Sequence, residues 1–125
     1  MNTDTIHSLA CLTIAIVWTM LSLSGASLAA SFDCAKAAAP DEKAICANPD
    51  LSALDSEMAG LYYGYKALPL LMGASGIRQD EAEAFLKQRS GCGSDVSCLR
   101  SAYTQRISAL KSDITEGVKN YCVGN

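Results

Sequence analysis

Cysteine is the residue type whose spacing gives the most chemical information in this 125-residue chain. One of the six cysteines, Cys11, lies in an apolar N-terminal segment. The other five follow it at Cys34, Cys46, Cys92, Cys98 and Cys122. No two of these form a C-x-x-C pair, so thioredoxin-like redox chemistry is not expected. Their intervals also fit poorly with the close pairs of a four-cysteine zinc site. We predict neither a metal nor a cofactor.

Spacing instead favours two disulfides. Cys34 and Cys46 are nearest neighbours in the first half of the chain, and Cys92 and Cys98 are nearest neighbours in the second. Each bridge would close a short loop, worth roughly 2–3 kcal/mol by the chain-entropy estimate. Cys122 is then left over, either as a free thiol or as a bond to another chain. We expect the free thiol.

Histidine and clustered acids are the other candidates for a reactive centre. The one histidine, His7, lies in the N-terminal segment, so the rest of the chain offers no imidazole for Ser-His-Asp or Cys-His catalysis. Asp80, Glu81 and Glu83 lie close together in the sequence. Acids in the first turn of a helix are favoured by its dipole, which explains them more simply than an active site does. We predict that the chain is not an enzyme.

The N-terminal segment has the pattern of a secretory signal peptide. Residues 9–23 carry no charge and lead into a small-residue run that ends at Ala29 and Ala30. Cleavage after one of these two alanines is expected, which assigns residues 1–30 to the signal. Export to the periplasm or the medium would place the cysteines in an oxidising compartment.

One acidic residue fits this interpretation badly. Asp4 lies in an N-terminal stretch that has no Lys or Arg, whereas signal peptides usually begin with basic residues. A retained membrane anchor is therefore the first alternative and a buried core helix the second. If the signal is removed, residues 31–125 form one domain that has no membrane segment.

The sign of the charge changes along the predicted domain. Residues 33–57 carry six carboxylates and two lysines, whereas residues 87–119 carry six cations and three carboxylates. A net charge of −3 for the whole chain argues against a nucleic-acid binder, which needs a clustered basic surface. Two solvated helix faces of opposite charge are the simpler interpretation, and electrostatic steering of a partner is the alternative.

Helices are expected to position these residues, beginning with one between Pro49 and Pro69. Asn48 is a favourable N-cap, and Pro49 suits the first helical position because its missing N–H costs nothing there. Apolar residues then recur at intervals of three and four, as one helical face requires. They are Leu51, Leu54, Met58, Leu61 and Tyr65. Gly60 and Gly64 lie beside this stripe and would let another backbone approach.

Three further helices are predicted. Pro40 opens a short one that runs through Cys46, and residues 77–88 form a longer one with Phe85 and Leu86 turned inward. Ser94 is the candidate N-cap of the last helix. The apolar stripe of that helix consists of Val96, Leu99, Tyr103, Ile107, Leu110 and Ile114.

The predicted fold is all-α: a small disulfide-stapled antiparallel helical bundle of one short and three longer helices, after an N-terminal signal helix. The Cys34–Cys46 bridge would tie the segment before the first helix onto that helix. The Cys92–Cys98 bridge would clamp the corner between the last two helices. The loop predicted for Leu68–Gly76 contains Leu70–Met72, which we expect to tuck under the bundle rather than to form an exposed apolar surface.

Two cysteine-bearing segments also carry a family resemblance. The first runs from Ser31 to Asp55 and includes Phe32-Asp33-Cys34 and Glu42-Lys43-Ala44-Ile45-Cys46. The second is looser and is marked by Phe85–Arg89, Cys92-Gly93, Cys98-Leu99, Tyr103, Arg106-Ile107 and Leu110. Over about residues 32–110 the chain resembles the LprI-type lysozyme inhibitor N-terminal domain family of small secreted bacterial proteins. The resemblance also supports the two disulfide pairs.

The resemblance implies a protein that acts by binding another protein, with lysozyme as the first candidate partner. Lysozymes of the animal type are usually basic, so an acidic first half would attract one. The alternative is an envelope binding or scaffolding module with a different protein partner. No inhibitory residue can be assigned from the sequence, and the oligomeric state stays open.

Overall fold

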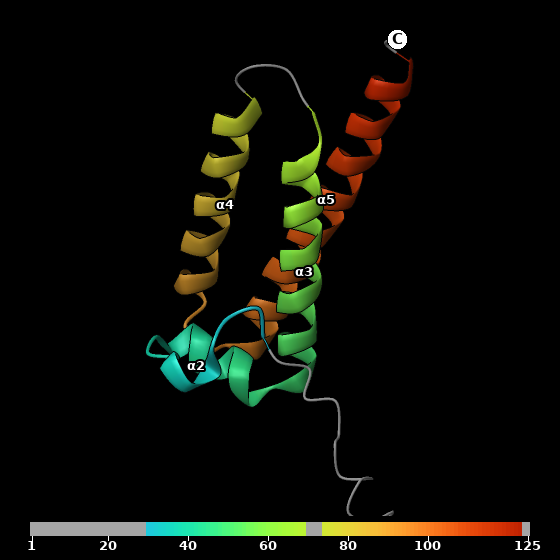
Figure 1. Ribbon diagram of the computed structural model, residues 1–125. Helices are drawn as coiled ribbons and strands as arrows, with labels where there is room; N and C mark the ends of the chain where they lie inside the picture. The colour runs from blue at the N-terminus through green and yellow to red at the C-terminus, as the bar shows by residue number, and fades with distance from the viewer. Residues whose placement is uncertain (1–29, 70–73, 124–125) are drawn as a thin grey trace, which may run out of the picture.

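The computed structural model describes residues 30–69 and 74–123, and Figure 1 shows them as helices joined by short connections. A 3-10 turn, η1 (Cys34–Lys36), precedes four α-helices. These are α2 (Pro40–Ala47), α3 (Pro49–Ala67), α4 (Ala74–Gly91) and α5 (Val96–Val123). The described part of the chain contains no strand. The predicted all-α bundle of one short and three longer helices is therefore confirmed.

Consecutive long helices run antiparallel. In Figure 1, α3 and α5 lie side by side and point the same way, and α4 runs in the opposite direction. The most extensive packing is between α3 and α5, and α4 packs mainly on α5. The short α2 closes the lower end of the bundle, where it contacts all three longer helices.

The start of α3 follows the prediction. The Asn48 side chain accepts hydrogen bonds from the backbone N–H groups of Asp50 and Leu51 at 3.1 and 3.3 Å, and Pro49 occupies the first helical position. The helix ends at Ala67, two residues before Pro69, because a proline disfavours helical backbone in the residue that precedes it.

The predicted cap of α5 was wrong by one residue. Asp95, not Ser94, is the residue before the helix, and its Oδ1 accepts from the backbone N–H groups of Ser97 and Cys98 at 2.9 and 3.0 Å. These bonds hold the pKa of the Asp95 carboxyl below its usual value, the Cys98 N–H contributing most. The preceding turn depends on Gly93, whose φ of +55° is unfavourable for residues with a Cβ.

Helix α4 is longer than predicted, because it begins at Ala74 rather than at about residue 77. Its first turn therefore contains no acid, and Asp80, Glu81 and Glu83 lie further along the helix, where the dipole does not account for them. Near its start, Arg78 donates to the backbone oxygens of Lys66 and Leu68 at 3.1 and 3.2 Å. This side chain thus satisfies carbonyl groups at the end of α3.

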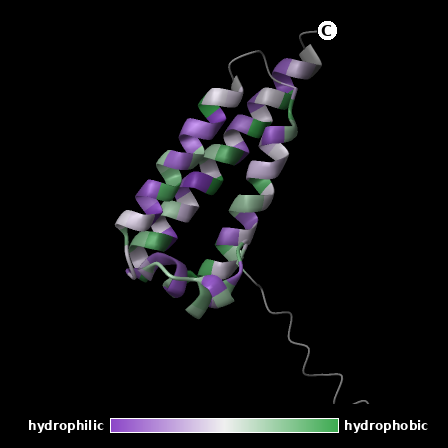
Figure 2. Cartoon of the chain, turned by 60° about the vertical axis from the view of Figure 1, so that its left-hand side comes forward, coloured by the Kyte–Doolittle hydropathy of each residue, from purple (hydrophilic) through white to green (hydrophobic). Residues whose placement is uncertain are grey.

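The core lies where α2, α3, α4 and α5 meet. Its buried members from these helices are Ile45, Leu51, Phe85, Leu99, Ala102, Tyr103 and Ile107. Phe85 and Tyr103 pack edge to face with ring centroids 5.2 Å apart. Figure 2 shows hydrophobic and hydrophilic residues alternating along the helices, as expected for helices that bury one face.

Two residues predicted to face the core do not. Leu86 is 48% exposed, since neighbouring residues point about 100° apart around a helix and Phe85 takes the inward direction. Val96, the first residue of α5, is 38% exposed. The predicted close approach at Gly60 and Gly64 is also absent, because no neighbouring atom lies within 4 Å of a Cβ built at either position.

None of the described helices is long and apolar enough to cross a membrane. The proposed signal at residues 1–30 lies outside the described residues except for Ala30, and so do His7 and Cys11. Residues 70–73 also lie outside them, so the expected tucking of Leu70–Met72 stays a prediction.

Candidate functional site

Both predicted disulfides are present. Cys34 and Cys46 join η1 to α2 with their Cα atoms 5.7 Å apart, and Cys92 and Cys98 join the end of α4 to the start of α5 at 5.6 Å. The first bridge ties the N-terminal segment to the bundle, and the second closes the tight corner around Gly93. Bridges of this kind are typical of a chain that folds in an oxidising compartment.

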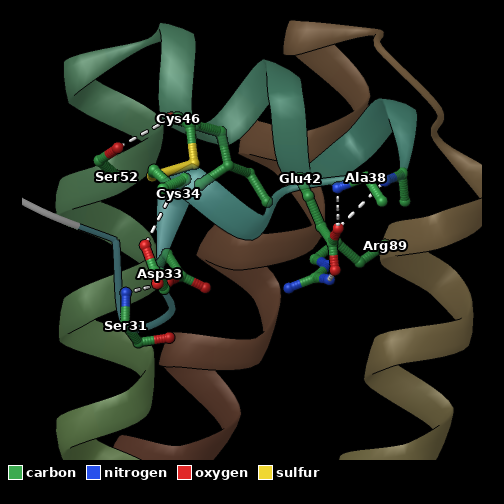
Figure 3. The surroundings of a disulfide bond; sticks show 12 residues. Ser31, Asp33, Cys34, Ala38, Glu42, Cys46, Ser52 and Arg89 are labelled. Atoms are coloured by element: carbon green, nitrogen blue, oxygen red, sulfur yellow. Dashed lines mark hydrogen bonds and ion pairs between the residues drawn. A yellow bond between two sulfur atoms is a disulfide. The ribbon is translucent and has the colours of Figure 1, made fainter.

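Hydrogen bonds reinforce the first bridge (Figure 3). The Glu42 carboxylate accepts from the backbone N–H groups of Ala38 and Ala39 at 2.9 and 3.0 Å, which fixes the turn between η1 and α2. These two bonds lower the pKa of Glu42, and the positive charge of Arg89 lowers it further. The Ser52 hydroxyl donates to the backbone oxygen of Ile45 at 2.8 Å, so α2 and α3 are also linked.

A nearly buried ion pair connects α2 to α4. The Arg89 Nε donates to the Asp41 Oδ2 at 2.8 Å, and the side chains are 12% and 3% exposed. The same guanidinium lies 4.0 Å from the Glu42 carboxylate and 5.6 Å from the centre of the Phe32 ring. One cation therefore holds the N-terminal segment, α2 and α4 together.

A second buried polar contact connects α3 to α5. The Tyr103 hydroxyl donates to Asp55 Oδ1 at 2.8 Å, and both residues are at most 1% exposed. Burial raises the pKa of Tyr103, and the hydrogen bond to Asp55 raises it further. Neither side chain meets solvent, so this pair is placed to orient α3 against α5 rather than to contact a substrate.

In the fold, most of the acids in the first half of the chain pair with cations of the second half. Carboxylates from the first half meet cations from the second: Asp41 and Glu42 with Arg89, Asp50 with Arg100, and Glu57 with Lys111. Asp33 pairs with Lys36, and Asp55 is buried. All six acids of residues 33–57 are thus paired or buried. Only the pairs made by Arg89 are largely shielded from solvent, since the side chains of the other three pairs are between 45% and 84% exposed.

An apolar groove lies between α3 and α4. It has a volume of about 120 Å³ and is lined by Met58, Tyr62, Ala82, Phe85, Leu86 and Arg106. The half-exposed Leu86 leaves apolar surface open to solvent beside it. Arg106 of α5 pairs with Glu81 at 3.3 Å through Nη1, while its buried Nη2 has no hydrogen-bond partner among the described residues.

The other residues that the sequence analysis considered for a reactive or metal-binding site do not lie together in the described part of the chain. Asp80 and Glu83 are exposed, and Glu83 accepts a hydrogen bond from Gln79, whereas Glu81 turns to Arg106. No group of three or more His, Cys, Asp or Glu in the described ranges is placed to hold a metal ion. Cys122 lies in α5, but its side chain is outside the described part.

Sequence reasoning missed the buried acids Asp41 and Asp55 and the mostly shielded Arg89 that pairs with Asp41. A signal was present for Asp55, which lies four residues after Leu51 and three before Met58, inside the apolar stripe of α3. An acid at such a position needs a buried partner. Asp41 gave no comparable signal, because an acid in the first turn of a helix is expected to be solvated.

Comparison with models of known families, with curated proteins and with solved structures finds no match for this chain. The resemblance to the LprI-type inhibitors therefore stays a prediction drawn from the residues themselves.

Proposed function

We propose that this chain is an exported protein-binding module without a catalytic centre, and that a lysozyme is its partner. Export to the periplasm or the medium is supported by the two disulfides, since such bonds persist in oxidising compartments. Removal of an N-terminal signal peptide that ends at Ala29 or Ala30 is part of the same proposal.

The observation that carries a binding function is the groove between α3 and α4. The groove brings Met58, Phe85 and Leu86 together into one apolar depression, and Leu86 extends it to the surface, where a partner side chain could contact it. A volume of about 120 Å³ is small beside the roughly 300–1,000 Å³ of small-molecule sites. It suits a single apolar side chain, which we assign to the protein partner.

Lysozyme is proposed on the resemblance of residues 32–110 to the LprI-type inhibitors. The ion pairs between the two halves of the chain leave little unpaired negative charge on residues 33–57. Attraction of a basic enzyme is therefore a minor contribution, and apolar contact at the groove supplies the affinity. Inhibition should accordingly depend only weakly on salt.

The same ion pairs favour one alternative, an envelope binding or scaffolding module whose partner is not basic. Such a partner would use the same groove, because the requirement for apolar surface does not change. The two proposals differ only in the identity of the protein that supplies the apolar side chain.

A cell-wall lysis assay tests the lysozyme proposal. The full chain, exported and processed by a bacterial host, is titrated against a lysozyme of the animal type, and lysis should fall as the inhibitor approaches equimolar amounts. Leu86→Gln should weaken inhibition, whereas the matched control Val118→Gln, at a similarly exposed residue of α5 outside the groove, should not. Unchanged lysis at micromolar excess would reject lysozyme as the partner.

The alternative requires a separate outcome. If lysis is unchanged, chemical crosslinking in intact cells should yield a defined complex that Leu86→Gln removes and Val118→Gln keeps. A complex that survives both substitutions would exclude the groove as the contact site.

A further inference from the structure

Asp55 is a buried carboxylate that no cation contacts directly among the described residues, since Arg89 interacts with it only through the Tyr103 hydroxyl. Its exposed fraction is 1%, and none of the ion pairs of this structure includes it. Two donors reach it: the Tyr103 hydroxyl at 2.8 Å and the backbone nitrogen of Ser31 at 2.6 Å. Both donors are uncharged while Ser31 lies within a longer chain. A buried carboxylate without a directly paired cation is costly, even when it is hydrogen bonded.

The Ser31 nitrogen is held at Asp55 from its C-terminal side. Phe32 packs against the core, and Cys34 is bonded to α2, so the segment that carries Ser31 has two nearby attachments. Figure 3 shows Ser31 beside α3 and close to Asp33, which precedes the bridge. The segment is therefore attached to the bundle on the C-terminal side of Ser31 as well as through the buried Ala30 before it.

We propose that Asp55 binds the N-terminal amino group of the mature protein. This amino group forms on Ser31 when the peptide bond between Ala30 and Ser31 is cut during export. The inference rests on the proposed export and signal removal, and it selects one of two candidate cleavage bonds. Cleavage one residue earlier would leave the Ser31 nitrogen as an uncharged amide. The charged amino group would then lie on Ala30 and not on the nitrogen that is 2.6 Å from Asp55 Oδ2.

The chemistry is a hydrolysis by a signal peptidase. Water adds across the Ala30–Ser31 bond, and its hydroxyl goes to the carbonyl carbon of Ala30, which leaves with the signal as a carboxylate. The Ser31 nitrogen keeps the electron pair of the broken bond and takes up protons. An α-amino group has a pKa of about 7.7–8.0 in unstructured peptides, so it is mostly an ammonium at neutral pH.

Cleavage thus converts a hydrogen bond between an uncharged amide and a carboxylate into an ion pair between an ammonium and the same carboxylate, with the Ser31 nitrogen already in place. The Ser31 nitrogen already lies within hydrogen-bond distance of Asp55 Oδ2, at 2.6 Å, so an ammonium there would form a charge-assisted bond with the carboxylate. The buried charge of Asp55 is therefore balanced by an ammonium in the processed chain but not in its precursor. Folding is therefore more favourable after signal removal than before it.

The first measurement is the N-terminus of the protein made from the full-length chain and recovered from the cell envelope. Intact mass and N-terminal sequencing should show that it begins at Ser31. A chain that begins at Ala30, whose own side chain is buried in the core, would overturn the inference and leave export intact. An unprocessed chain would overturn both.

The second measurement is the reactivity of the new amine towards acylation near neutral pH, read by peptide mapping of the processed protein. Pairing with Asp55 should slow the reaction in the native protein about tenfold or more relative to the urea-unfolded protein, the factor that one pKa unit gives. Equal rates would contradict the pairing. This comparison needs no variant.

Substitutions on α3 separate the role of Asp55 from a general effect of charge. Asp55→Asn should raise the native acylation rate towards the unfolded rate. The control Asp50→Asn, at an exposed acid of the same helix that binds Arg100, should leave it unchanged. Equal protection in both folded variants would overturn the assignment of Asp55.

Discussion

Arg89 of α4 and Asp41 of α2, 48 residues apart in sequence, form an ion pair at 2.8 Å that is almost closed to solvent. The pair stands at the lower end of the bundle, where α2 crosses the longer helices (Figure 1). It joins elements that make few other contacts with each other, since α4 packs mainly on α5 and α2 mainly on α3.

Breaking this pair should destabilise the domain. Arg89→Met leaves the Asp41 charge nearly buried and unpaired, and we expect a loss of about 2–4 kcal/mol in the free energy of unfolding, measured with urea. The matched control is Arg100→Met, which breaks an exposed pair with Asp50 and should cost less than about 1 kcal/mol. Equal losses in the two variants would show that burial of the Arg89 pair contributes nothing.

The two disulfides should contribute unequally. Replacing both Cys34 and Cys46 by serine should cost about 3 kcal/mol, and replacing both Cys92 and Cys98 about 2 kcal/mol, because the first bridge closes the longer loop. Urea unfolding under non-reducing conditions measures both losses. The opposite order, or no loss for either pair, would contradict the chain-entropy account.

The cap of α5 predicts a specific acid dependence. Because the Cys98 and Ser97 N–H groups lower the pKa of Asp95, its carboxylate stabilises the fold above its ordinary pKa of about 3.9, and this contribution is lost as the pH falls through the lowered value. Asp95→Asn keeps a capping side chain but cannot titrate. The difference in melting temperature between the two proteins should shrink on acidification. A difference that stays constant from neutral pH to about pH 2 would refute this cause.

A side chain at Gly93, in the turn between α4 and α5, should destabilise the fold. Gly93→Ala places a Cβ on a residue with φ of +55°, and we expect a loss of about 1 kcal/mol. Gly91→Ala is the matched control, because Gly91 ends α4 at negative φ with open space around it, and it should be neutral or slightly stabilising. Thermal unfolding compares the two, and equal effects would contradict the conformational argument.

The helices, their caps and the disulfides follow from local rules. Asn48-Pro49, the apolar spacing of α3 and the nearest-neighbour cysteine pairs each specify structure within a few residues, so the sequence predicts them. The errors at Ser94 and Leu86 are shifts of one residue, which arise because adjacent positions compete for one cap or one inward direction.

The buried polar contacts could not be predicted in the same way. Asp41 meets Arg89 and Asp55 meets Tyr103 only after the helices pack, and the separation in both cases is 48 residues. The sequence shows the charge asymmetry but not its pairing, because helix orientation decides which acid meets which base. The groove beside Leu86 has the same origin, since its lining residues come from three different helices, α3, α4 and α5.

The oxidation state of the cysteines, measured in protein taken directly from cells, is the most direct test that the chain is exported and forms both disulfides. Free thiols are alkylated during lysis, and the intact mass is measured. The account predicts a chain without its signal in which Cys34, Cys46, Cys92 and Cys98 are all unlabelled and Cys122 alone is labelled. A full-length chain alkylated at all six cysteines would contradict export, both disulfides and the proposed role in the envelope.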